Sequence, residues 1–258
     1  MNSRNKLAEM PIRPLLYTMA VPLMLSLLVQ SLYNIVDSIF VARLSETALT
    51  AASLVYSIQF LMIAVGVGTA VGLNALLSRK IGEHKPEEAC RAATTGLFLM
   101  IFTSLIFSMI GIFLSDTIAT KLAADSELQE LCKQYLSINL VYCWGIFLQT
   151  YAQRLLQAVG DTVLSMLSLI IGAVLNIILD PIFITVLKPY GLGIEAAAYA
   201  TVFSQFVQAV ITLWYFRKKS PNVKIGRIRI DGELLPQVLS VGVSALLMQI
   251  LTLVQQTV

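Results

Sequence analysis

The chain has 258 residues, of which 57% are hydrophobic and only 13% are charged, and its formal net charge is +3. Soluble domains carry about 25% charged residues, and a soluble core at this length cannot bury so much apolar surface. The composition therefore excludes an ordinary soluble protein and predicts an integral membrane protein. The three cysteines, Cys90, Cys132 and Cys143, form no CxxC pair and indicate neither a disulfide framework nor a zinc site.

Seven uncharged windows follow one another along the chain, and each reaches or approaches the ~20 residues that a helix needs to cross a bilayer. Helices are expected because a lipid-exposed backbone must satisfy its own hydrogen bonds, and because these runs are too continuous for barrel strands. We therefore predict an all-α bundle of six transmembrane helices and a partial seventh. The windows are 14–36, 47–78, 92–115, 134–153, 162–179 with a continuation to 187, 196–216 and 234–258.

Lysine and arginine are divided unevenly between the two ends of these helices. Fourteen lie in the N-terminal segment and in the second, fourth and sixth connections, against four in the first, third and fifth. Because cytoplasmic loops carry the excess of positive residues, the N-terminus is expected in the cytoplasm. The predicted organisation is a six-helix lobe at 1–216, a basic cytoplasmic linker at 217–233 and the start of a second lobe at 234–258.

Small residues and prolines predict where helices approach closely or bend. Gly68 and Gly72 are four residues apart in the second window, a spacing that favours close contact with a neighbouring helix. Pro22 in the first window and Pro181 in the fifth each remove a backbone donor. Either proline therefore marks a hinge or a simple packing distortion.

Two acids, Asp37 and Asp180, interrupt the predicted spans. An acid at the centre of a membrane helix costs on the order of 2.5–3.5 kcal/mol on insertion scales, so such residues mark functional sites. At ~1.5 Å per residue, both acids fall in the outer half of the membrane, and Thr201 lies at a similar depth. A carboxyl group there can hold a proton, bind Na⁺ or pair with a cationic solute, and the sequence indicates no other metal site.

Four of the predicted helices carry polar residues spaced three or four apart, which places each set on one helix face. Together they predict a wet internal cavity, although hydrogen bonds between helices would use the same residue types. The four sets are Ser26, Gln30, Tyr33 and Asp37; Tyr142, Gln149 and Gln153; Asn176 and Asp180; and Thr201, Ser204, Gln205 and Gln208.

Several segments in combination resemble the multidrug and toxic compound extrusion (MATE) family, in its branch of small bacterial multidrug exporters. They are 34–82, which begins NIVDSIFVARL, then LLQAVGDT (155–162), NIILDPIFI (176–184) and GIEAAAYATVFSQ (193–205). The resemblance implies twelve helices in two lobes, and export of organic cations in exchange for H⁺ or Na⁺ across the bacterial cytoplasmic membrane. This chain would then be the N-terminal lobe and the start of helix 7, a truncated half whose partner is the missing C-terminal lobe.

The resemblance also assigns roles to particular residues. It implies a cation-coupling site at Asp37, Asn176, Asp180 and Thr201, and a cavity lined by Gln30 and Tyr33 beside a bend at Pro22. The sequence departs from the family at Ala42 and Ser45, where glycine is frequent, which loosens the first outer turn but leaves the site intact.

Other functions fit the residues less well. A flippase for lipid-linked oligosaccharides, from the same superfamily, would need basic residues within the membrane, whereas the charges inside these spans are acidic. An intramembrane enzyme would need a clustered acidic motif for Mg²⁺ or a serine–histidine or histidine-rich set. The sequence has no such acidic motif and only one histidine, His84 in a loop, so no enzyme and no cofactor are expected. A non-functional fragment is the remaining alternative. The expected partners are small organic cations and membrane lipids, with no nucleic acid.

Overall fold

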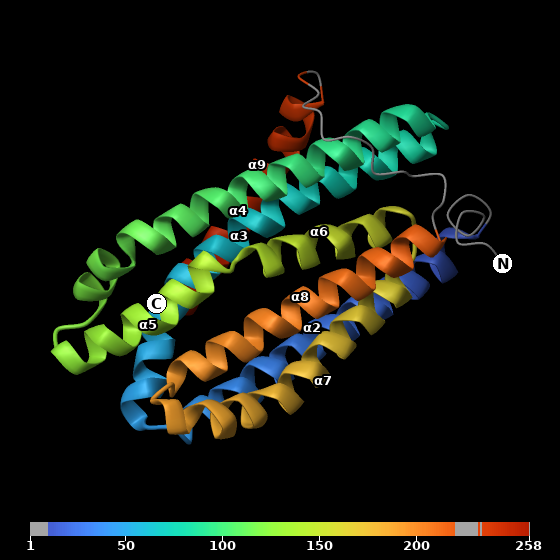
Figure 1. The fold of residues 1–258 in the computed structure, drawn as a ribbon. Coiled ribbons are helices and arrows are strands. Elements are labelled where there is room, and N and C mark those ends of the chain that lie inside the picture. Colours follow the sequence, from blue (N-terminus) through green and yellow to red (C-terminus); the bar gives the residue numbers. More distant parts are fainter. Residues whose placement is uncertain (1–9, 220–231, 233, 258) are drawn as a thin grey trace.

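The computed structural model describes residues 10–219, 232 and 234–257, which form eight α-helices and one short 3-10 helix. Figure 1 shows the long helices lying alongside one another as a bundle. The elements are α2 (Ile12–Ala42), α3 (Glu46–Gly82), α4 (Pro86–Leu122), α5 (Ser126–Val141), α6 (Trp144–Ala158), α7 (Thr162–Leu187), η1 (Lys188–Tyr190), α8 (Ile194–Lys219) and α9 (Leu235–Thr257).

Six helices are long and apolar enough to cross a bilayer, namely α2, α3, α4, α7, α8 and α9. The predicted all-α membrane protein is therefore confirmed, and the chain is a multi-pass membrane protein. The fourth predicted span, 134–153, differs from the expectation of one helix. It is formed by two shorter helices, α5 and α6, which meet at Tyr142 and Cys143.

The break between α5 and α6 contains no proline and is held by side chains of α4. The Ser108 hydroxyl donates to the Val141 carbonyl at 2.8 Å, and the Cys143 thiol donates to the Ser104 carbonyl at 3.3 Å. Non-helical backbone at membrane depth is tolerated where the protein satisfies its polar groups. Helix α4 therefore supplies the hydrogen bonds that make this break stable.

The connections alternate between the two ends of the bundle. In Figure 1, the α3–α4 and α6–α7 connections lie at the same end as the start of α2 and the end of α8, and the α2–α3, α4–α5 and α7–α8 connections lie at the opposite end. The described parts of the predicted basic connections thus share one end. The helices extend beyond the uncharged windows, so that Lys80 lies inside α3 and forms ion pairs with Glu83 and Glu88. The predicted linker at 217–233 lies mostly outside the described residues.

Helix α9 packs closely on α3, as Gly68 and Gly72 predict. A Cβ atom on Gly68 would lie 2.9 Å from the Gly242 carbonyl oxygen, and one on Gly72 would overlap the Val238 carbonyl. These glycines therefore allow backbone contact between α3 of the predicted six-helix lobe and α9, the start of the expected second lobe.

Both prolines lie inside continuous helices, Pro22 in α2 and Pro181 in α7. Because proline has no N–H, Pro22 leaves the carbonyl of Thr18 without its helical donor. The hydroxyl of Thr162, in the first turn of α7, donates to that carbonyl at 3.5 Å. A side chain of the neighbouring helix thus replaces the missing backbone bond, and the hinge role of both prolines stays a prediction.

Candidate functional site

The two acids of the predicted spans lie on facing helices. Asp180 of α7 is 0% exposed, and Asp37 of α2 is half-buried and interacts electrostatically with it. The Asn176 amide donates to Asp180 Oδ1 at 3.1 Å and to Thr201 Oγ1 at 3.2 Å, which links α7 to α8. The structure therefore brings all four predicted cation-coupling residues into one cluster.

The cluster presents several oxygen atoms that lack a hydrogen-bond donor. Asp37 Oδ1, Asn176 Oδ1 and Asp180 Oδ2 are buried and have no partner among the residues that the structure describes. Buried polar atoms are nearly always paired, and unpaired buried charges are strongly unfavourable. Carboxylate and carbonyl oxygens are the ligands that hard cations prefer. The residues present therefore fit a proton on one of the acids or a bound Na⁺.

Two tyrosines border the acids, and only one of them was expected. Tyr33 of α2 interacts with Thr201 and with Asp37, as its place in the predicted polar set suggests. Tyr135 of α5 interacts electrostatically with both acids. The sequence signal that could have found it is the pair Tyr135 and Asn139, four residues apart near the start of the fourth window.

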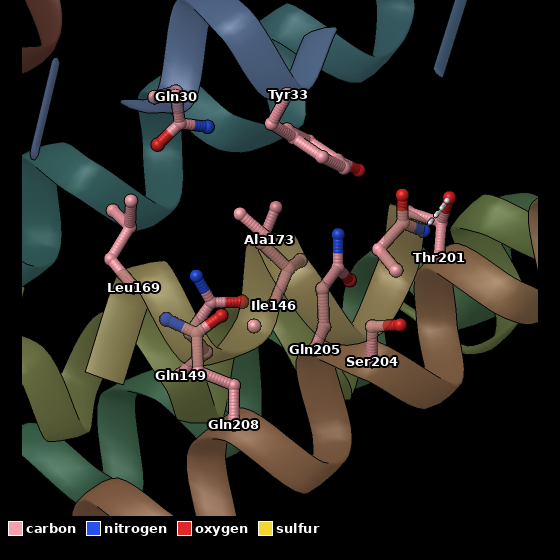
Figure 2. Close-up of a pocket in the computed structure, with 12 residues that line it drawn as sticks. Gln30, Tyr33, Ile146, Gln149, Leu169, Ala173, Thr201, Ser204, Gln205 and Gln208 are labelled. Atoms are coloured by element: carbon pink, nitrogen blue, oxygen red, sulfur yellow. Dashed lines mark hydrogen bonds between the residues drawn. The ribbon is translucent and has the colours of Figure 1, made fainter. Parts of the chain in front are cut away.

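A cavity of about 50 Å³ adjoins this cluster between α2, α6, α7 and α8. Figure 2 shows the side chains around it, with Thr201 towards the cluster and Gln149 and Gln208 side by side further along. Of the residues predicted to line a cavity, four do so, together with Ser204 and Gln208 of the same polar sets. The lining residues are Gln30, Tyr33, Ile146, Gln149, Leu169, Gly172, Ala173, Asn176, Thr201, Ser204, Gln205 and Gln208.

Two predicted cavity residues lie elsewhere. Tyr142 is at the α5–α6 junction, where its ring centroid is 6.2 Å from that of Tyr199. Gln153 lies one helical turn beyond Gln149 on α6, and its buried Nε2 atom has no partner among the described residues. The apolar lining residues Ile146 and Leu169 carry no polar signal, so the sequence offered no means of selecting them.

The size of the cavity limits what it holds in this conformation. Drug-sized ligands occupy pockets of about 300–1,000 Å³, far more than the 50 Å³ found here. One water molecule needs about 10–15 Å³ on this measure. The cavity therefore suits a short chain of water molecules beside a small cation.

A family model described as MatE matches residues 22–182, which is more than half of the chain. The chain belongs to the MATE family. Its family is thus one of transporters, and the predicted recognition is confirmed. The acids, Asn176 and most of the cavity lie within the matched residues.

This MATE chain also resembles characterised members of the family over nearly its whole length. It is 27% identical over 235 residues to the multidrug export protein MepA of Staphylococcus aureus (strain MRSA252), covering 90% of this chain and 51% of MepA. The chain spans about half the length of the curated relatives it matches.

Two solved structures extend the comparison to the fold. A MATE structure in complex with MaL6 has a TM-score of 0.88 at 28% identity, covering 97% of this chain and 56% of that one. An outward-facing multidrug resistance MATE transporter of the MOP superfamily has a TM-score of 0.83 at 29% identity, covering 92% and 52%. The present MATE bundle therefore corresponds to about half of a complete transporter structure.

Proposed function

We propose that this chain forms the N-terminal, cation-coupling lobe of an exporter that moves organic cations out of the cell in exchange for H⁺ or Na⁺. The observation that carries the proposal is the buried cluster in which Asn176 holds both Asp180 and Thr201, with Asp37 facing them. The relative MepA is named as a multidrug export protein. An acidic cluster suits cationic substrates, and it does not suit the anionic headgroup of a lipid-linked sugar.

Coupling follows from the charge of the two acids. When both carboxylates are ionised, they repel each other across the contact between α2 and α7. A bound proton or Na⁺ removes this repulsion and favours closer packing of the two helices, whereas an organic cation could neutralise the same acids only in a wider cavity. An ion shifts a conformational equilibrium only through such a difference in affinity between states.

We place this lobe in the bacterial cytoplasmic membrane with its N-terminus in the cytoplasm, as the basic connections indicate. The exposed apolar side chains of α2 and α4, such as Leu28 and Phe113, would face lipid or a second lobe. The C-terminal lobe present in longer relatives is the proposed partner, because alternating access needs two repeats that move against each other.

The test uses the full-length protein in sealed liposomes that carry a pH gradient reported by a fluorescent dye. Adding ethidium should dissipate the gradient in the wild type and leave it intact in Asp37→Asn, which keeps the shape of the side chain but not its charge. Asp116→Asn is the matched control, because Asp116 is an exposed acid paired with Lys133 outside the cluster. Loss of exchange in the control, or normal exchange in Asp37→Asn under both H⁺ and Na⁺ gradients, would refute the proposal.

A further inference from the structure

Polar side chains continue from the cavity towards the end of the bundle where α6 ends and α7 begins. We call them the polar column, and they come from three helices in mutual contact: Gln149, Gln153 and Gln157 of α6, Ser165 of α7 and Gln208 of α8. Gln208 is only 4% exposed, although its side chain is polar. A Cβ atom on Gly172 would overlap the Gln208 amide, so this glycine makes room for it.

The polar column contains buried atoms that protein groups leave unpaired. Gln149 Oε1, Gln153 Nε2 and Gln208 Nε2 have no hydrogen-bond partner among the residues that the structure describes. Buried polar atoms of this kind are satisfied by internal water, which typically makes about three hydrogen bonds. These unpaired amide atoms therefore offer positions for water between the cavity and that end of the bundle.

Arg154 places a positive charge at the far end of the polar column. The Arg154 guanidinium is half-buried and donates to Gln157 Oε1 at 2.9 Å, while Gln157 Nε2 donates to Ser165 Oγ at 3.1 Å. The Asn74 amide donates to the Arg154 backbone carbonyl at 3.0 Å, which fixes this turn of α6 against α3. No carboxylate pairs with Arg154 among the described residues, so its charge is not neutralised locally.

We propose that Arg154 is a charge barrier that stops the coupling cation from leaking along the polar column, an inference that rests on the proposed exchange function. A fixed positive charge beside a narrow hydrated path admits water and repels cations, as in other membrane pores. An exchanger needs such a barrier, because a cation that passes from the acid cluster to the cytoplasm without substrate dissipates the gradient. Arg154 thus acts on coupling without touching the acids.

The test measures leak without any substrate, in sealed liposomes containing the full-length protein and a trapped pH or sodium indicator. Arg154→Gln should raise the leak roughly tenfold or more, since tenfold corresponds to only about 1.4 kcal/mol of barrier and a nearby unit charge exceeds that even at an effective dielectric constant of about 20. Arg154→Lys should keep the leak low. Arg79→Gln is the matched control, because Arg79 is an exposed arginine paired with Glu83 away from the polar column.

The double variant Arg154→Gln with Asp180→Asn shows whether the leak passes through the acid cluster, and its leak should return to the wild-type level. If Arg154→Gln fails to insert, Gln157→Ala removes the amide that holds the guanidinium and should raise the leak several-fold. An unchanged leak in these single variants, or a leak that persists in the double variant, would overturn the inference. Normal ethidium exchange in Asp37→Asn would instead refute the exchange function, whatever the leak.

Discussion

Replacing Asn176 with leucine should destabilise the acid cluster by an amount that the hydrogen bonds define. The change keeps a similar side-chain size but removes the donor that reaches Asp180 Oδ1 at 3.1 Å and Thr201 Oγ1 at 3.2 Å. A hydrogen bond to a charged group contributes about 1.5–3 kcal/mol and a neutral one about 0.5–1.5 kcal/mol in soluble proteins. Polar contacts between membrane helices average only about 0.6 kcal/mol, so we expect a total loss of roughly 1–3 kcal/mol.

The loss should depend on the coupling ion, because the variant leaves the carboxyl of Asp180 buried without its donor. A ligand that binds only the folded state stabilises it in proportion to its concentration over its dissociation constant. If Na⁺ couples, wild-type protein should gain stability with Na⁺, and Asn176→Leu should gain less because it has lost an oxygen ligand. If a proton couples, both proteins should gain stability with acid, and Asn176→Leu should gain more because the ionised Asp180 has lost its donor. The measurement is denaturant unfolding in bicelles across a series of pH values and Na⁺ concentrations.

A matched control is Asn34→Leu, which makes the same substitution at an exposed position of α2 outside the cluster. It should change the unfolding free energy little and leave the response to the ion intact. Equal stability of Asn176→Leu and wild type, together with an unchanged ion response, would show that the contacts between Asn176, Asp180 and Thr201 do not organise a cation site.

Two further predictions concern the bundle outside the site. Gly72→Val should separate α3 from α9, because its side chain would occupy the space of an α9 carbonyl; cysteine cross-linking between the two helices should fall, and an unchanged yield would argue against the packing. The Arg79 side chain, which hydrogen-bonds to Glu83, holds the pKa of that carboxyl below its ordinary value. The ionised Glu83 carboxyl therefore contributes to stability at pH values above the ordinary pKa of glutamate, and this contribution is lost as the pH falls through the lowered pKa. Glu83→Gln should flatten the acid side of a plot of unfolding temperature against pH. An unaltered acid side would contradict this reasoning.

The residues that sequence alone could place are those for which the membrane imposes a clear cost. Asp37 and Asp180 stand out because an acid inside an apolar span is expensive, and their spacing to Tyr33 and Asn176 puts their partners on the same helix face. The spans themselves follow from hydropathy. Lys80 shows the limit of this argument, because pairing with Glu88 lets a helix extend past the first charged residue.

Features that depend on contacts between distant segments were not accessible in this way. The break at Tyr142 has no proline to announce it, and it depends on Ser104 and Ser108 of another helix. The position of Tyr135 beside the acids likewise depends on how α5 is oriented after that break. The cavity-lining role expected for Tyr142 came from treating the fourth span as one straight helix.

The hydrogen bond from the Thr162 hydroxyl to the Thr18 carbonyl links the bend of α2 to the first turn of α7. If α2 bends at Pro22 and moves away from α7, no water within a bilayer can donate to the Thr18 carbonyl. That carbonyl must therefore keep its hydrogen bond from Thr162 or find a new donor. The α6–α7 turn that contains Asp161, tied to Lys219 at the end of α8, precedes Thr162 directly. Bending of α2 therefore disturbs the α6–α7 turn, which makes that turn a suitable position for a fluorescent label that follows this motion.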